Sequence, residues 1–238
     1  MRFKFRNNAF LNFLIMAALS LLACESFASG VLPESPTLII NEAQNGGSIN
    51  VKNTENVPVL LYSKVVDLPD DPTPRLIVTQ PVARLEPGES QRVRFVLNKA
   101  GPLQHEHIKR VWFEGVAEKT SDGGAVAMTV RQDLPVIITP KGLLHKRDMW
   151  TDLSWSATAD TLTVNNTGKQ VVRLSPGLNL LPGRIVLALE KSYILPGESL
   201  TVTIPAGSRL SSQQKVEFSP VTRYGFDVGL QQAVLIAH

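Results

Sequence analysis

Apolar and polar residues alternate with a period of two in several short segments of the chain. The clearest are Ile49–Lys52, Val93–Phe95, Leu162–Val164 and Leu200–Ile204. This period places alternate side chains on opposite faces, which is typical of strands with one buried face. Turn-forming Gly, Pro and Asn residues separate the segments, and after residue 28 no segment sustains a helical pattern. The pattern predicts an all-β chain, and the regular spacing of its short strands favours β-sandwiches.

Two short motifs occur twice, in the same order. Val51–Thr54 recurs as Val164–Thr167, and Pro87–Ser90 recurs as Pro196–Ser199, displaced by 113 and 109 positions respectively. Nearly equal displacements indicate two similar units of about 100 residues each. We therefore predict one domain over 29–142 and a second over 148–238. A single large barrel is the alternative architecture.

The first 28 residues have the order of an export signal. Arg2, Lys4 and Arg6 precede an apolar run, Leu11–Ala23, that is interrupted only twice, and Ser26–Ala28 offers small residues at a cleavage site. The run is shorter than the roughly 20 residues of a membrane span, and no later segment qualifies. A buried N-terminal helix is the structural alternative. The segment predicts a signal peptide over 1–28 and release into the periplasm.

Cys24 is the single cysteine of the chain. Leu21–Cys24 resembles a lipobox, in which Cys24 would carry lipid and become the mature N-terminus. Cleavage after Ala28 is the interpretation we favour, and it leaves a mature chain without cysteine. Such a chain relies on its cores rather than on disulfides.

Composition narrows the function classes further. The chain is 43% hydrophobic and 19% charged, and its 238 residues are enough for one large or two modest cores. Removal of residues 1–28 takes away three basic groups and Glu25, so the formal charge falls from +3 to +1. The remaining basic residues are scattered and lack interleaved aromatic residues. This distribution disfavours a nucleic-acid partner.

Residues with catalytic or metal-binding chemistry are few. His105 and His107 have a spacing found in some metal sites, but no cysteine lies nearby and only two other histidines occur in the chain, so we predict a solvated loop. Asp70–Asp71 lies between prolines and is expected to be a solvated turn. No nucleophile elbow, phosphate-binding loop or zinc-protease motif is present. The sequence predicts no enzyme, no cofactor and no metal, and a metal-dependent enzyme built on the two histidines is a remote alternative.

One stretch resembles a known family. Ile77–Phe95, which contains Arg-Leu-Glu-Pro-Gly-Glu at 84–89, is similar to the signature of PapD-like periplasmic pilus chaperones of the chaperone–usher pathway. Pro102–Val116, Val126–Gly142 and Leu162–Gly168 are similar to later strands of that family. The resemblance implies two immunoglobulin-like β-sandwich domains set at an angle. It also implies a chaperone that stabilises pilus subunits by donating an edge strand and delivers them to an outer-membrane usher.

The chain departs from the family at one site. Family members hold the carboxylate at the C-terminus of their client with an Arg in the first strand and a Lys late in the first domain. Here Leu38 and Pro135 stand at or near those positions. The segment around Arg131 resembles a divergent, archaic branch, so Arg131 is our first candidate for a carboxylate contact and Arg94 our second. The alternative is that both are ordinary solvated strand residues.

The resemblance also suggests which residues contact the client. Val126, Met128 and Val130 share one face of a strand by the period of two and coincide with the apolar donor positions of the family. The alternative is that they fill the core of their own domain. A different class of function is an exported two-domain structural or adhesive surface component. Such a component should carry its own N-terminal donor segment, for which Gly30–Ser35 is short.

Overall fold

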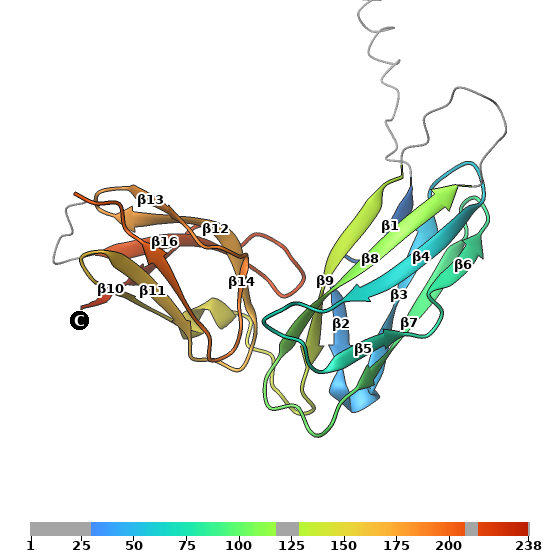
Figure 1. Ribbon diagram of the computed structural model, residues 1–238, viewed down its shortest axis with the longest axis horizontal. Helices are drawn as coiled ribbons and strands as arrows, with labels where there is room; N and C mark the ends of the chain where they lie inside the picture. The colour runs from blue at the N-terminus through green and yellow to red at the C-terminus, as the bar shows by residue number, and fades with distance from the viewer. Residues whose placement is uncertain (1–29, 118–128, 208–213, 238) are drawn as a thin grey trace, which may run out of the picture.

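The computed structural model describes residues 30–117, 129–207 and 214–237. In these ranges the chain forms strands with only two short 3-10 turns, and Figure 1 shows two β-sandwich domains set at an angle. The predicted fold class is confirmed. The predicted signal peptide lies outside the described residues. Within the described residues no helix is long and apolar enough to cross a membrane.

The N-terminal domain is a sandwich of nine strands in two layers. Its strands are β1 Val31–Pro33, β2 Leu38–Asn41, β3 Gly46–Asn53, β4 Val59–Val66, β5 Arg75–Val78, β6 Val82–Leu85, β7 Ser90–Asn98, β8 His107–Ala117 and β9 Arg131–Thr139. The hydrogen-bonded order is β5-β7-β3-β2-β9-β8-β4-β6, with β1 on β3, and β2 and β3 share the single pair Asn41–Gly46. At this corner the order divides into one layer of β1, β3, β7 and β5 and another of β2, β9, β8, β4 and β6. The chain changes layers early, because β1 pairs with β3 whereas β2 pairs in parallel with β9. A 3-10 turn, η1 (Glu42–Gln44), then leads into β3.

The C-terminal domain is a second sandwich. Its strands are β10 Leu153–Ala157, β11 Thr161–Asn166, β12 Val172–Leu181, β13 Ile185–Ala188, β14 Tyr193–Ile194, β15 Ser199–Thr203, β16 Lys215–Val221, β17 Gln231–Val234 and β18 Ile236–Ala237. The order β15-β11-β10-β18 forms one sheet, and β13-β12-β16-β17 with β14 forms the other. The turn η2 (Met149–Asp152) leads into β10. Trp155 and Phe218 lie within the core, with ring centroids 5.2 Å apart.

The repeated motifs contact each other in both domains. The buried Asn53 side chain donates to the carbonyls of Leu85 and Glu86 at 3.2 Å, and its backbone carbonyl accepts from Gly88. In the second domain the buried Asn166 side chain donates to Ile194 at 3.1 Å, and its carbonyl accepts from Gly197. Each Pro-Gly-Glu-Ser turn is therefore fastened to the matching Asn. The sequence repeat corresponds to one structural device used twice.

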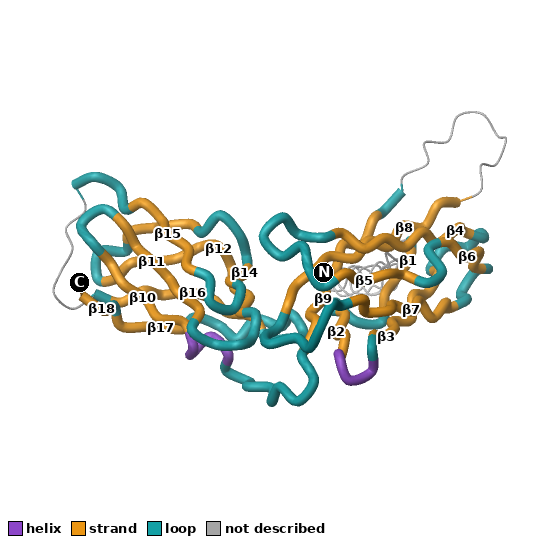
Figure 2. Tube along the Cα trace, turned by 60° about the horizontal axis from the view of Figure 1, so that its bottom comes forward, coloured by secondary structure: helices purple, strands orange, loops and turns teal. Residues whose placement is uncertain are grey.

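The domains meet over a small apolar contact. Ile108 and Ile137 of the N-terminal domain pack with Val171 of the C-terminal domain, and Tyr193 and Leu195 lie against them. Among the described residues no strand pairs across the junction, and Figure 2 shows the two groups of strands joined by loops. The division at residues 142–148 stays a prediction.

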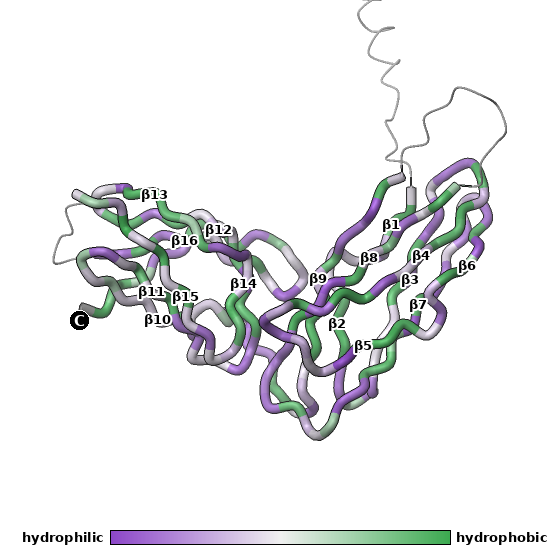
Figure 3. The backbone as a smooth tube through the Cα atoms, in the orientation of Figure 1, coloured by the Kyte–Doolittle hydropathy of each residue, from purple (hydrophilic) through white to green (hydrophobic). Residues whose placement is uncertain are grey.

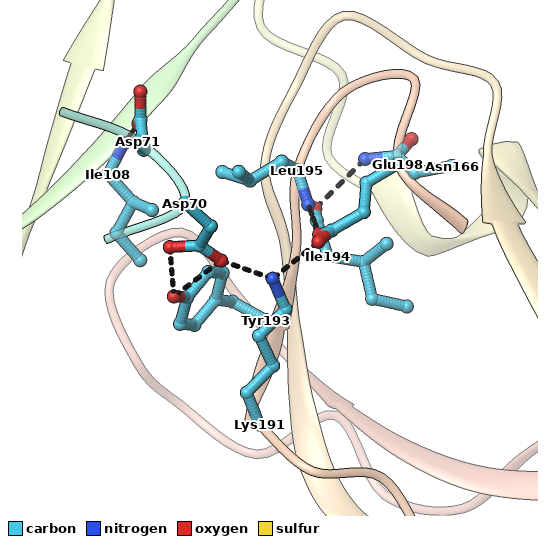
Figure 4. Close-up of polar contacts among 9 residues, drawn as sticks. All are labelled: Asp70, Asp71, Ile108, Asn166, Lys191, Tyr193, Ile194, Leu195 and Glu198. Atoms are coloured by element: carbon cyan, nitrogen blue, oxygen red, sulfur yellow. Dashed lines mark hydrogen bonds and ion pairs between the residues drawn. The ribbon is translucent and has the colours of Figure 1, made fainter. Parts of the chain in front are cut away.

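Polar bridges surround this contact, and they correct one expectation. Asp70 accepts hydrogen bonds from the Tyr193 hydroxyl at 2.8 and 2.9 Å and pairs with Lys191, which also pairs with Glu198 at 2.5 Å (Figure 4). Burial alone would raise the pKa of Asp70, but hydrogen bonds from Lys191 and Tyr193 outweigh it and lower that pKa. Asp71 is buried. Asp70 lies in an exposed turn, as expected, whereas the expectation is wrong for Asp71, whose carboxylate accepts from the Ile108 amide of its own domain at 2.7 Å.

The histidine segment is also at the junction. Glu106 is only 2% exposed; its carboxylate accepts from the Val171 amide at 3.1 Å and lies 3.5 Å from Arg223. Burial raises the pKa of Glu106 despite the nearby Arg223. The flanking His105 and His107 are half-buried, and His107 Nδ1 lies 2.8 Å from Asp71 Oδ1. The predicted solvated loop is therefore wrong, since this segment packs against the C-terminal domain.

Candidate functional site

Strand β9 has a free edge on the side of the N-terminal domain that is turned toward the C-terminal domain (Figure 1). On one side β8 pairs with it from Arg131 to Ile138. On the other side β2 pairs only with Val136–Thr139. Residues Arg131–Pro135 therefore have a strand partner on one side only, among the residues that the structure describes. We call this segment the free edge.

The two faces of β9 have different surroundings. Leu134, Val136 and Ile138 point into the core of the N-terminal domain. By the period of two, the residues between them lie on the opposite face, which at Ile137 contacts the C-terminal domain. We call this opposite face the inner face. Figure 3 shows that β9 changes from hydrophilic at its start to hydrophobic toward the domain junction.

Charged and aromatic side chains follow the inner face away from the junction. Arg110 donates from Nε to Asp133 Oδ1 at 2.8 Å. Further out, Arg131 pairs with Glu114 at 2.9 Å, and its guanidinium lies 4.4 Å from the centroid of the Trp112 ring. Opposite charges face each other across β8 and β9, so these groups largely neutralise one another.

The structure brings together only part of the predicted site. Val130 directly precedes β9, is 39% exposed, and lies next to Arg131 at the outer end of the free edge. Val126 and Met128 lie outside the described residues. Arg94 is exposed on β7, in the opposite layer, and lies far from the free edge in the strand order. The predicted contacts of all five residues with a client stay predictions.

A different basic residue lies where the free edge ends. Thr37 directly precedes β2, and its hydroxyl accepts a hydrogen bond from Arg173 Nη1 at 3.2 Å. Arg173 belongs to β12 of the C-terminal domain. Sequence reasoning missed it because the two residues are 136 positions apart and no motif marks either of them. Only the packing of one domain on the other places them together.

Metal binding has no support in the described part of the chain. His105 and His107 have ring centroids 4.6 Å apart, and His105 Nδ1 lies 3.0 Å from the Glu106 carbonyl. No group of three or more His, Cys, Asp or Glu side chains suited to a metal ion occurs among the described residues. The principal feature of the arrangement is a strand segment, Arg131–Pro135, whose backbone is unpaired on one side.

Comparisons with known proteins agree on one family. Residues 30–144 match the family described as pili and flagellar-assembly chaperone, PapD N-terminal domain. The fimbrial chaperone YhcA of Escherichia coli (strain K12) is 41% identical over 202 residues, covering 84% of this chain and 88% of that protein. The chaperone protein LpfB of Salmonella typhimurium (strain LT2) is 27% identical over 206 residues, covering 83% and 86%.

Solved structures show the same fold. A structure of the Salmonella enterica SafA pilin in complex with the SafB chaperone matches with a TM-score of 0.70 at 21% identity, covering 88% of this chain and 98% of the matched chain. Because both sandwiches fall within these shares, the match extends over the whole two-domain fold. Together with the sequence relatives, this places the chain in the PapD-like family of pilus-assembly chaperones.

Proposed function

We propose that this chaperone holds pilus subunits by pairing their backbone with the free edge of β9. The observation that carries the proposal is the unpaired side of Arg131–Pro135. An unpaired strand edge is a template for another strand, and strand addition is a common way to bind an incomplete sheet. A pilus protein that lacks a strand would gain both backbone hydrogen bonds and apolar contacts here.

The period of two supports the assignment of the apolar donors. Val130 is on the same side of the strand as Leu134, which enters the core of its own domain. Val130 is nevertheless 39% exposed, so it lies beyond the end of that core. In the sequence, Met128 and Val126 continue the same alternation of apolar positions. We propose that these three side chains enter the core of the bound subunit.

The two candidate arginines differ in how well they can contact a bound subunit. Arg131 borders the free edge and can bind a client carboxylate by sharing its guanidinium with Glu114. Arg94 is in the opposite layer and is the weaker candidate. The chaperones of this family are not enzymes, and we propose that this chain too acts by binding alone.

Export and delivery complete the proposal. The sequence pattern of residues 1–28 supports secretion and a mature start near Ser29 in the periplasm, from where the chaperone would pass subunits to an outer-membrane usher. The intact mass of the protein purified from periplasm tests whether the mature chain begins near Ser29. A diacylglyceryl mass on Cys24 would replace the free form with a lipid-anchored one.

The binding proposal is tested with charged variants of the donor residues. Val130→Asp and Met128→Asp would place a charge into the apolar core of the bound subunit, where burial without a partner costs several kcal/mol. We expect tagged variants to lose co-purifying pilus subunits, identified by mass spectrometry, by at least tenfold. Val186→Asp is the control, since Val186 is 74% exposed on β13 of the other domain.

Thermal unfolding of each free variant separates binding from folding. Val130→Asp should leave the melting temperature nearly unchanged because the side chain is at the edge of the core. A stable Val130→Asp protein that retains its subunits would contradict the proposal. A wild-type protein that co-purifies with no pilus subunit would do the same.

A further inference from the structure

We propose that the outer face of β3, β7 and β5 binds the surface of a membrane that contains anionic phospholipids. The outer face is the side of these strands that points away from the core of the N-terminal domain, and we call it the basic face. Its basic residues are all exposed: Lys52 of β3, Arg75 of β5, and Arg92 and Arg94 of β7. This binding goes beyond the proposed function and does not depend on it.

The strand register brings these four residues together, although they are scattered in the sequence. Arg92 and Arg94 lie on the same side of β7, because the residues that alternate with them are buried in the core. On β3, Lys52 is level with the first residue of β7, and on β5, Arg75 is level with the last. Since β7 has nine residues, the charges extend over about 25 Å along the strands.

The charges of the basic face are not neutralised by the protein. No ion pair to any of the four basic side chains occurs among the described residues. Glu34 lies beside the face, but its carboxylate accepts from the Asn50 amide at 2.9 Å and from the Asn50 side chain at 2.7 Å. These hydrogen bonds lower the pKa of Glu34, and the charge of Arg92 lowers it too. A carboxylate that remains ionised offsets only part of the positive charge.

Positive charge is concentrated on this face of a nearly neutral protein. The mature chain over 29–238 has a formal charge of +1, and without the four basic residues its formal charge would be −3. The rest of the mature chain is therefore acidic on balance. Near an anionic surface, such a distribution turns the basic face toward that surface.

Exposed apolar side chains lie among the charges. Leu32 of β1 is exposed and pairs with Lys52. Ile77 of β5 and Val96 of β7 are exposed and pair with each other, and Val96 lies two residues from Arg94 on the same side of the strand. Cations together with apolar side chains suit the boundary between lipid headgroups and acyl chains, where phosphates lie above apolar carbon.

The extent of the face favours a lipid surface over a single anion. Side chains on one face of a sheet stand in parallel rows, so they can reach one flat surface together. Charges spread over about 25 Å cannot converge on one phosphate or carboxylate, but each can reach a different headgroup. Each Lys or Arg near an anionic lipid surface raises the partition onto it by about fivefold. The apolar side chains between the charges favour lipid over an acidic polypeptide, which is the alternative ligand.

The basic face and the free edge belong to different layers of the sandwich. The outer sides of two packed layers point in opposite directions, so the basic face is turned away from the inner face of β9. A chaperone that holds a pilus subunit along β9 can therefore bind lipid at the same time.

Flotation with lipid vesicles tests the basic face. The full mature chaperone is mixed with vesicles of equal parts phosphatidylglycerol and phosphatidylcholine, and with vesicles of phosphatidylcholine alone. We expect binding to the anionic vesicles only, and a loss of about 25-fold when Arg92→Gln and Arg94→Gln are combined. Arg184→Gln with Lys215→Gln removes the same charge from exposed positions of the C-terminal domain, and this control should bind within twofold of wild type.

The dependence on salt gives a second measurement. Raising the salt concentration from about 0.05 to about 0.5 M shortens the distance over which exposed charges interact, so binding to anionic vesicles should fall by at least tenfold. Binding that does not change with salt would overturn the proposal, because charge would then play no part in it. Equal binding to the two kinds of vesicle would overturn it for the same reason.

Variants of the basic face decide which surface binds. A folded protein with Arg92→Gln and Arg94→Gln that binds anionic vesicles within twofold of wild type would overturn the proposal. If that variant does not fold, Lys52→Gln with Arg75→Gln decides by the same criterion. Binding to soluble polyglutamate without binding to anionic vesicles would also overturn it and would assign the face to an acidic polypeptide. These outcomes are independent of whether pilus subunits bind to β9, so failure of the lipid proposal and failure of the proposed function are distinguishable.

Discussion

At the scale of single residues, Glu42 shows how one buried carboxylate fixes the base of the N-terminal domain. It accepts from the Leu103 amide at 3.1 Å and the Lys141 amide at 2.7 Å, and it pairs with Lys99 at 2.8 Å. The Lys99 contact and the backbone hydrogen bonds lower its pKa to about 2. Glu42 therefore joins η1, the loop before β8 and the chain that leaves β9.

Replacement of Glu42 by Gln should destabilise the protein in a pH-dependent way. A carboxyl group whose pKa falls on folding from 4.5 to about 2 stabilises the folded state above pH 4.5, and this stabilisation is lost as the pH falls toward 2. We expect Glu42→Gln to cost about 1–2 kcal/mol at pH 7 and much less near pH 2. Urea denaturation at both pH values measures this. Equal losses of unfolding free energy at the two pH values would contradict this prediction. Glu190→Gln, at an exposed carboxylate, is the control and should leave the free energy of unfolding unchanged at both pH values.

At the scale of elements, the repeated Asn and Pro-Gly-Glu-Ser turn explain why the sequence was informative about the fold. Each buried Asn donates hydrogen bonds to backbone carbonyls of neighbouring segments. Each turn also contains a Glu whose carboxylate accepts from a nearby backbone amide: Glu89 from Glu86 and Glu198 from Leu195, both at 2.8 Å. Such a device needs these residue types in this order. Two copies therefore signal two domains even without long sequence identity.

Alanine at either Asn should weaken mainly its own domain. Asn53→Ala removes a hydrogen-bond donor from the carbonyls of Leu85 and Glu86, and Asn166→Ala removes one from the buried carbonyl of Ile194. We expect a loss of about 2–3 kcal/mol in each case. Native-state hydrogen exchange measures the stability of each domain separately and so shows which domain is destabilised. Asn98→Ala, at an exposed position in β7, is the control, and a loss no larger than that of the control would show that the Asn contacts do not stabilise the domains.

The sequence alone predicted only part of the candidate site. Strand alternation placed Val130 and Arg131 on opposite faces of one strand, and that strand has a free edge at Arg131. The same reasoning gave no way to separate Arg94 from the site, because layer membership depends on β7 pairing with β3 and β5. The contact of Arg173 with Thr37 and the contacts of Asp70 with Lys191 and Tyr193 were missed for a related reason. Their partners belong to the other domain, and sequence periodicity carries no information about domain packing.

At the scale of the whole molecule, the two domains are joined by a contact that leaves the free edge of β9 on the inner side of the angle (Figure 1). Ile108 and Ile137 fix the apolar part of this contact, and Glu106 and Asp70 fix its polar rim. The angle between the domains thus determines how accessible the free edge is to a bound subunit.

Hydrogen–deuterium exchange on the purified complex with a pilus subunit reports directly on strand pairing. Backbone amides that enter a new sheet exchange more slowly, whereas side-chain contacts alone have little effect on them. We predict slower exchange in residues 126–134 of the complex than in the free chaperone, and unchanged exchange in β7. Unchanged exchange in residues 126–134, with protection confined to another surface, would contradict binding of pilus subunits through the edge of β9.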